Sequence, residues 1–322
     1  MSDCNSGGMM CLMQNKYNEQ IGAVLAIAGG IGWGVSGAVG QYLFTVEHMD
    51  SHWLVPVRLG LAGILLVLFS LNRYKGLTLR PLKNAEDCKD LLIYGIAGIS
   101  CCQYFYFRTI QLSSAAIGTI LQDLSPIFIL LATSVLEHRK PHQLEVLAVF
   151  AALLGVTLLS THGDFTHLKI PAAALLTGVL SAVCVTIYNV YPKRLLRTYP
   201  ILILQGWAFL MGSVLFAFLF QVWRYYVPVT SAGMLGIFIV VLVGNILAFT
   251  CYMQGVKLIG PKKGILYGFS EPLSAALLTV FWFHQPFHFY DIVGFLLVFA
   301  GIVLISIAPE QKDDSDSPSR LP

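Results

Sequence analysis

The sequence of 322 residues is 56% hydrophobic and only 11% charged, with a mean hydropathy of +0.72. Because soluble domains carry about 25% charged residues, this composition excludes a water-exposed globular protein and favours a chain that lies in the lipid bilayer. The net charge of +3 comes without basic stripes interleaved with aromatic residues, so nucleic-acid binding is not indicated.

Residues 1–20 lack a basic segment followed by an apolar one, so we expect a polar cytoplasmic tail and no cleavable signal peptide. The apolar stretches that follow predict an all-α polytopic membrane protein with ten transmembrane helices, because about 20 apolar residues cross the hydrocarbon. In chain order the helices are 21–45, 52–71, 90–110, 113–136, 143–160, 171–191, 201–222, 232–256, 262–283 and 288–307. A second polar tail, 308–322, ends the chain.

The positions of the basic residues support this count. With a cytoplasmic N-terminus, 16 Lys and Arg residues fall in inner loops and tails and 2 in outer loops, as insertion favours. The inner set is Lys16, Arg73, Lys75, Arg80, Lys83, Lys89, Arg139, Lys140, Lys193, Arg194, Arg197, Lys257, Lys262, Lys263, Lys312 and Arg320, and the outer set is Lys169 and Arg224. We therefore expect ten helices with both termini in the cytoplasm.

An internal repeat becomes visible when the chain is shifted by 146 residues, because 106–160 then aligns with 252–306 without a gap. Five helices per copy make the copies inverted in the membrane, which predicts a 5+5 architecture with units 21–160 and 161–307. Inverted repeats with a site between them are typical of transporters. A symmetric membrane scaffold without transport is the alternative.

Two acidic residues lie near the middle of predicted helices, Asp123 in the fourth and Glu271 in the ninth, each close to a proline, Pro126 or Pro272. A mid-helix proline frees a backbone carbonyl, which in a membrane must face protein or a water-filled cavity. Helices four and nine are therefore expected to kink and to line a central cavity. A carboxyl group there could bind substrate or exchange protons, or it could be a neutral structural group.

Arg58 is the arginine well inside a predicted helix, and it needs an anionic or carbonyl partner unless it reaches the membrane surface. Neutral polar and aromatic side chains could complete a cavity for a small organic solute, although each alone also fits helix packing. They are Trp33, Gln41, Gln103, Gln122, Tyr188, Asn189, Gln205, Trp207, Asn245 and Tyr267.

Gly30, Gly34, Gly37 and Gly40 follow one another in the first helix, where small residues let helices approach closely. His138 and His142, like His284 and His288, have the i,i+4 spacing that can hold a metal on a helix, but the expected topology puts one pair inside and the other outside. No cysteine spacing supports a zinc site or a disulfide framework, so we expect no metal and no cofactor. No catalytic motif occurs, and an integral membrane enzyme is only a distant alternative.

Several stretches together resemble the EamA branch of the drug/metabolite transporter superfamily over residues 20–307. They are WGVSGAVGQYLF, VRLGLAGILL, LQDLSPIFILL, WAFLMG and SEPLSAALLTVFW. The resemblance implies a secondary active transporter, often an exporter, of amino acids, other metabolites or drugs. Arg58, Pro126 and Pro272 match residues of that branch, whereas Asp123 departs from it.

We therefore expect an inner-membrane exporter of a small organic metabolite that works by alternating access and is coupled to protons or another gradient. The alternative is an uncoupled facilitator of amphipathic solutes. The expected partners are the solute, protons and the lipid bilayer, in a monomer or homodimer.

Overall fold

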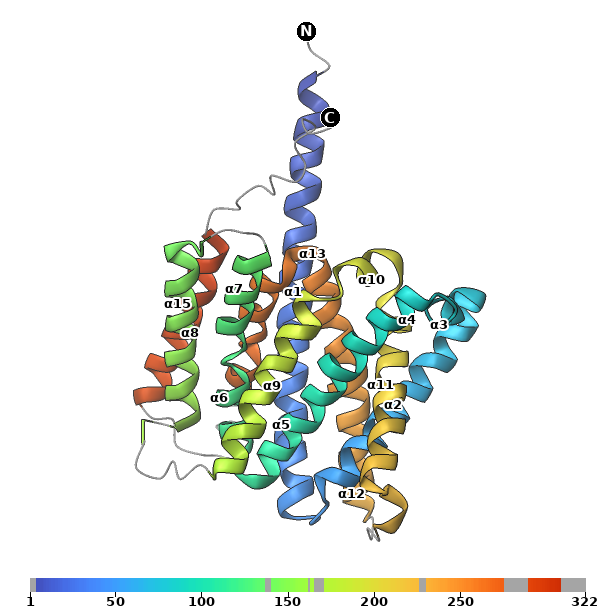
Figure 1. The fold of residues 1–322 in the computed structure, drawn as a ribbon. Coiled ribbons are helices and arrows are strands. Elements are labelled where there is room, and N and C mark those ends of the chain that lie inside the picture. The colour runs from blue at the N-terminus through green and yellow to red at the C-terminus, as the bar shows by residue number, and fades with distance from the viewer. Residues whose placement is uncertain are drawn as a thin grey trace.

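A computed structural model describes residues 4–136, 140–161, 163–164, 171–225, 230–274 and 289–307. The regular structure in these ranges is entirely helical, and the helices form one bundle (Figure 1). Helix α1 extends beyond one end of the bundle.

The described residues up to Thr161 form ten helical elements. They are α1 (Cys4–Thr45), α2 (Ser51–Tyr74), the 3-10 helix η1 (Lys75–Leu79), α3 (Arg80–Lys83), α4 (Ala85–Leu92), the π-helix η2 (Ile93–Ser100), α5 (Cys101–Leu112), α6 (Ala115–Gln122), α7 (Ser125–Leu136) and α8 (Gln143–Thr161). Segments α4, η2 and α5 follow one another directly and form the predicted third transmembrane helix.

The second half is built in the same way. Its elements are α9 (Ala172–Val190), α10 (Lys193–Thr198), α11 (Ile201–Phe220), the 3-10 helix η3 (Val222–Arg224), α12 (Ser231–Ile239), the π-helix η4 (Val240–Ala248), α13 (Phe249–Gly268) and α15 (Phe289–Ile307). Residues 275–283 of the predicted ninth helix lie outside the described ranges.

By length and hydropathy alone, six helical stretches of the described chain can cross a membrane, and Gln143–Leu158 and Ile292–Gly301 are shorter apolar helices. One of the six stretches, Ser231–Ser274, contains two predicted helices, because the backbone turns at Gly260 (φ 80°) and Pro261. The third predicted helix is present as α4–η2–α5. The all-helical architecture predicted from the sequence is confirmed.

The two halves repeat their irregular features at the predicted offset of 146 residues. A hairpin follows α5 at Ser114, and the matching hairpin is at Gly260 in α13. The two hairpins lie at opposite ends of the bundle (Figure 1), as inversion requires. The π-helices η2 and η4 contain the matching glycines Gly98 and Gly244.

Helix packing follows the same symmetry. Helix α2 packs on α11 and α8 packs on α15, so the second and fifth helices of one repeat each contact their counterparts in the other. Helix α1 packs on η4 and α13, while α9 packs on η2 and α5, so the first helix of each repeat contacts the third helix of the other. The core of the bundle therefore lies between the two repeats.

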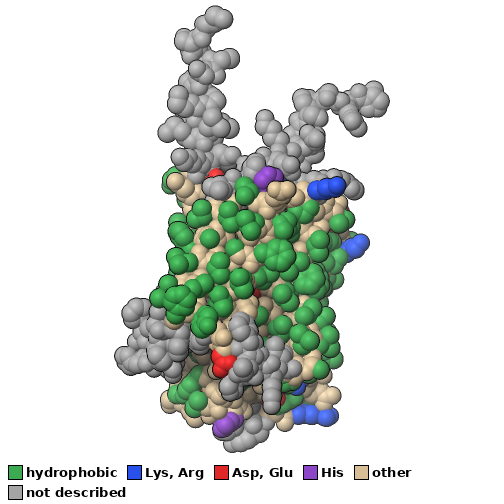
Figure 2. Space-filling model, turned by 90° about the vertical axis from the view of Figure 1, so that its left-hand side faces the viewer, with side chains coloured by type: hydrophobic (Ala, Val, Ile, Leu, Met, Phe, Trp, Pro, Cys, Tyr) green, Lys and Arg blue, Asp and Glu red, His purple; other side chains and the backbone are tan. Residues whose placement is uncertain are grey.

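The outer surface of the bundle is apolar along its length. Large hydrophobic side chains are exposed on α2, α8, α11 and α15, for example Leu68 (59% exposed) and Phe218 (69% exposed). Figure 2 shows hydrophobic side chains over the middle of one face, with Lys and Arg side chains toward its ends. This distribution fits a bundle whose sides contact lipid.

Charged residues stabilise the two ends of the bundle. At the end where α3, α10 and the Gly260 turn lie, Lys263 contacts Glu19 at 2.7 Å and Lys262 contacts Glu145 at 3.7 Å. At the opposite end, Asp50 caps α2 by accepting a hydrogen bond from the His52 backbone N–H at 2.7 Å.

Asp50 also accepts a hydrogen bond from the Gln111 side chain at 3.1 Å, which joins the start of α2 to the end of α5. Burial by itself raises the pKa of Asp50, but the hydrogen bonds from His52 and Gln111 outweigh it and leave this pKa below its usual value. The ionised carboxylate is therefore the form that stabilises this end.

Candidate functional site

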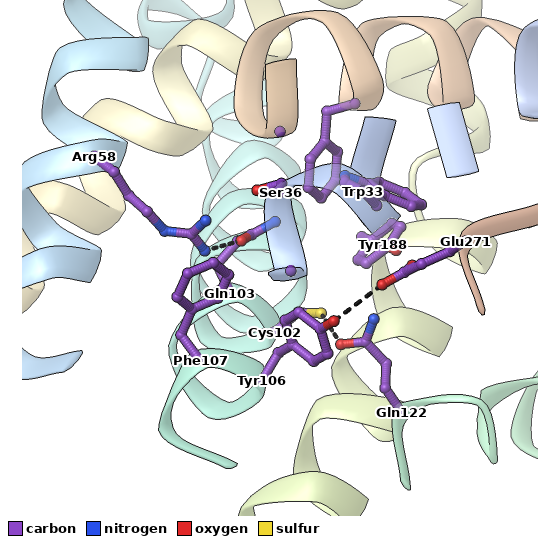
Figure 3. A pocket seen from close by; sticks show the side chains of 13 residues that line it. Trp33, Ser36, Arg58, Cys102, Gln103, Tyr106, Phe107, Gln122, Tyr188 and Glu271 are labelled. Atoms are coloured by element: carbon purple, nitrogen blue, oxygen red, sulfur yellow. Dashed lines mark hydrogen bonds between the residues drawn. The ribbon is translucent and has the colours of Figure 1, made fainter. Parts of the chain in front are cut away.

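A cavity lined by polar and aromatic side chains lies inside the bundle, between the two repeats (Figure 3), and its space of about 370 Å³ includes a part that is open to solvent. The first repeat lines it from α1, α2, α5 and α6, and the second from α9, η4, α13 and the helical residues 270–274 that follow the turn at Phe269. The lining residues are Trp33, Ser36, Gly37, Arg58, Cys102, Gln103, Tyr106, Phe107, Gln122, Tyr188, Gly244, Phe249 and Glu271.

Two interrupted helices lead to this cavity. The fourth helix breaks at Asp123–Leu124, between α6 and α7, and the ninth breaks at Phe269, directly after α13. Phe269 is the 146-residue counterpart of Asp123, so the interruptions are related by the repeat. Each interruption lies three residues before the proline that the sequence singled out. Interrupted helices are common around transporter sites, because they bring polar backbone groups to the middle of the membrane.

Close contacts with α1 position the chain around Glu271. A Cβ atom at Gly30 would lie 2.8 Å from the Gly268 carbonyl oxygen and 3.0 Å from the Glu271 backbone nitrogen. The Ser270 hydroxyl donates a hydrogen bond to the Ile27 carbonyl at 2.9 Å. Glycine thus lets α1 contact the interrupted helix directly.

Glu271 is buried, with 6% of its surface exposed, and its side chain lines the cavity. The Tyr106 hydroxyl donates a hydrogen bond to Glu271 Oε1 at 3.0 Å (Figure 3). The same hydroxyl lies 3.3 Å from the Thr119 hydroxyl. No Lys, Arg or His of the described residues lies within 4.0 Å of the Glu271 carboxylate. The described partner of this carboxyl group is therefore a neutral hydroxyl.

Arg58 lies on another wall of the cavity and is 1% exposed. Its guanidinium donates hydrogen bonds to the side-chain oxygens of Gln103 and of Asn245, the latter at 3.2 Å. The guanidinium carbon lies 3.4 Å from the centre of the Phe107 ring, a cation–π contact. The groups of the described chain that contact the Arg58 guanidinium, two amide oxygens and one aromatic ring, are thus all uncharged.

Asp123 lies where α6 ends, with its backbone N–H bonded to the Thr119 carbonyl at 2.8 Å. Its Oδ2 atom is buried and has no hydrogen-bond partner within the described part of the chain. The side chain is not among the groups that line the cavity. Asp123 and Glu271 therefore differ in their surroundings, although both belong to interrupted helices.

The residues singled out from the sequence fall into three groups. Six of them line the cavity: Trp33, Arg58, Gln103, Gln122, Tyr188 and Glu271. Asn245 contacts Arg58 from η4, and Tyr267 packs in the hydrophobic core. Trp207 lies elsewhere, since its Nε1 donates to the Thr78 carbonyl at 2.8 Å near one end of the bundle.

Sequence analysis missed the face of α5 that contributes most to the cavity. Cys102, Tyr106 and Phe107 lie on the same side as Gln103, at the spacings expected for one face of a helix. Gln103 was recognised because it is polar, whereas its aromatic neighbours looked like core residues. The helical spacing from Gln103 could have identified them.

The described residues contain no group of three or more His, Cys, Asp or Glu side chains placed to hold a metal ion. The cavity instead combines one guanidinium, one carboxyl group, two amides and several aromatic rings. Polar and charged groups inside an inverted repeat, surrounded by lipid-facing helices, define a multi-pass membrane transporter.

Comparison with known proteins gives the family. The model of the EamA-like transporter family matches residues 20–161 and 172–307, and the chain belongs to this family. It is thus a membrane transporter and not an enzyme. The resemblance recognised from the sequence motifs is confirmed.

The curated relatives include inner membrane transporters of bacteria. The chain is 33% identical over 299 residues to the uncharacterized inner membrane transporter YicL of Salmonella typhimurium, covering 93% of this chain and 97% of that one. It is 23% identical to the uncharacterized transporter YrdR of Bacillus subtilis, covering 91% and 93% of the two chains. A solved crystal structure shares the fold with a TM-score of 0.72 at 18% identity, covering 90% of this chain and 96% of its own.

Proposed function

We propose that this transporter moves a small organic solute across a bacterial inner membrane by alternating access and that Glu271 couples the movement to protons. The observation that carries the proposal is the Glu271 carboxyl group, which lies buried in the cavity with a neutral hydroxyl as its described partner. The carboxyl group proposed to couple transport, that of Glu271, thus lies in the cavity between the two inverted repeats.

The symmetry of the bundle supports alternating access. The hairpins at Ser114 and Gly260 occupy matching positions at opposite ends, and both interrupted helices approach the cavity. If the repeats exchange conformations, the cavity opens first to one side of the membrane and then to the other. The glycine contacts between α1 and the interrupted ninth helix allow the surfaces to move without large side chains between them.

A carboxyl group can couple such a cycle to a proton gradient. A charged carboxylate is costly when it is shut off from water with no cation in contact with it, so closing the cavity favours a bound proton at Glu271. Opening to water on the other side lets the proton leave. Asp123 is proposed as a second carboxyl group that assists the transfer, because its unpartnered oxygen belongs to the matching interruption.

The arrangement in the membrane follows from charge. The Lys and Arg residues around α3, α10 and Lys262 lie at the end of the bundle where α1 enters, and this end is proposed to face the cytoplasm. Tails 1–20 and 308–322 then lie in the cytoplasm, and units 21–160 and 161–307 form the two repeats. Export is the proposed direction.

Proteoliposomes with an internal pH-sensitive dye test the coupling. An outward or inward solute gradient, set with a mixture of the twenty amino acids, keto acids and nucleosides, should drive proton movement through the wild type. Glu271→Gln keeps a group that accepts the Tyr106 hydrogen bond, so the fold should persist. This variant should exchange solute across the membrane but no longer move protons.

Glu47→Gln serves as the matched control, because Glu47 lies in the connection between α1 and α2 and is not a cavity residue. It should couple like the wild type. Solute flux through the wild type that is indifferent to the pH gradient would favour the uncoupled facilitator. Normal coupling in both Glu271→Gln and Asp123→Asn would show that the carboxyl groups are structural.

A further inference from the structure

The cavity contains hydrogen-bond donors that have no acceptor. The buried nitrogens Nε1 of Trp33, Nε of Arg58 and Nδ2 of Asn245 lack partners among the described residues. Trp33 and Arg58 line the cavity, and Asn245 is bonded to Arg58. Buried polar groups in folded proteins are nearly always hydrogen-bonded, so two unpartnered N–H groups on the cavity wall, and a third on the side chain that accepts a hydrogen bond from Arg58, indicate an acceptor supplied by a ligand.

The positive charge of Arg58 also lacks an anion. No carboxylate of the described residues lies within 4.0 Å of its guanidinium, whose neighbours are two amide oxygens and the Phe107 ring. A guanidinium does not lose its proton in proteins, so it cannot escape the penalty of burial by becoming neutral. An anionic oxygen at this position would satisfy both the charge and the free N–H groups.

We propose that Arg58, Trp33 and Asn245 form the binding site for a carboxylate group of the transported solute. This inference rests on the proposed function, since it names the chemical class of solute that the cavity accepts. A guanidinium presents parallel N–H groups that match a carboxylate. The binding groups come from α1, α2 and η4, so both repeats hold the anion and its release requires them to separate.

The charges of the cavity favour a solute with one negative charge. Arg58 is the cationic side chain among its described lining residues, and Glu271 is the acidic one. With a proton bound to Glu271, as proposed above, one carboxylate balances the charge of Arg58. A dianion such as a phosphate monoester would leave one negative charge unbalanced in the cavity. The rings of Tyr188 and Phe249 line the remaining wall and can contact an apolar solute body.

Matched acid and amide pairs test this inference by binding. Purified protein is tested by thermal shift and by tryptophan fluorescence titration with L-leucine, L-phenylalanine, L-methionine, phenylacetate and 2-oxoisocaproate, each against its carboxamide. At least one acid should bind and stabilise the wild type, and its amide should bind at least about tenfold more weakly, because a charged hydrogen bond is lost.

Two substitutions of the same residue give the internal comparison. Arg58→Gln should abolish the preference for the acid, while Arg58→Lys should retain part of it, because the charge stays but the paired N–H geometry is lost. Arg108→Gln is the matched control. Arg108 belongs to the same helix as Gln103 but donates to Gln111 at 3.0 Å outside the cavity, so this variant should keep the full preference.

The inference is overturned if no acid of the panel binds better than its amide, or if Arg58→Gln retains the preference. Vesicles loaded with the same panel separate this outcome from failure of the proposed function. Efflux of amides as fast as acids would leave transport intact and refute the carboxylate site. Selective acid binding without any efflux would support the site and refute the proposed transport of these solutes.

Discussion

Replacing Gly30 with alanine tests whether the contact between α1 and the interrupted ninth helix is as close as the structure shows. The new Cβ would lie 2.8 Å from the Gly268 carbonyl oxygen and 3.0 Å from the Glu271 nitrogen, and it would overlap the Ser270 hydroxyl. The hydroxyl can rotate away, but the two backbone atoms cannot. The ninth helix must therefore shift outward and take Glu271 with it.

The size of the effect follows from these contacts. Overpacking a rigid site costs about 1–3 kcal/mol, and losing the hydrogen bond from Ser270 to Ile27 costs about 0.5–1.5 kcal/mol. Alanine recovers about 1 kcal/mol of helix propensity relative to glycine. The net loss in the free energy of unfolding is about 0.5–3.5 kcal/mol, which for a chain of 322 residues lowers Tm by roughly 1–5 °C.

Thermal unfolding in detergent and the vesicle dye assay measure the two consequences. Gly30→Ala should lower Tm and weaken proton coupling together, because the shift moves the backbone of Glu271. Gly76→Ala is the control, since a Cβ at Gly76 meets no atom within 4 Å. A Gly30→Ala protein with the Tm and coupling of the wild type would refute the close contact and its role in positioning Glu271.

Other sites give simpler predictions. Because the pKa of Asp50 is lowered in the folded protein, its stabilisation is present above the unfolded pKa of about 4 and is lost as the pH falls through the lower folded pKa. Asp50→Asn should therefore flatten the acid branch of a Tm-against-pH curve. Lys263→Glu should lower the free energy of unfolding by about 0.2–1 kcal/mol, because it replaces the ion pair with Glu19 by two like charges. Adding Glu19→Lys should restore the stability in low salt, and no recovery in the double variant would refute the pairing. Trp207→Phe should cost about 0.5–1.5 kcal/mol by freeing the Thr78 carbonyl, but it should leave solute preference unchanged, and a changed preference in the efflux panel would place Trp207 at the site.

The sequence was sufficient to identify the architecture. A membrane span must be long and apolar, and the shift of 146 residues reveals the duplicated unit. The same shift relates the hairpins at Ser114 and Gly260 and the interruptions of the fourth and ninth helices. The interruptions lie close to Pro126 and Pro272, because proline acts locally on the backbone. The polar residues Arg58, Gln103 and Glu271 were recognisable as candidates, since a polar group in an apolar helix is costly wherever it faces.

Only the tertiary structure decided which candidates share one cavity. Trp207 and Gln103 look alike as polar-tipped residues in membrane helices, yet helix rotation directs Trp207 to a backbone carbonyl and Gln103 to Arg58. The hydroxyl partner of Glu271 comes from Tyr106, 165 positions away in the chain, so local sequence could not predict the pair. Hydropathy specifies which segments lie in lipid, but the packing of the two repeats determines which side chains meet between them.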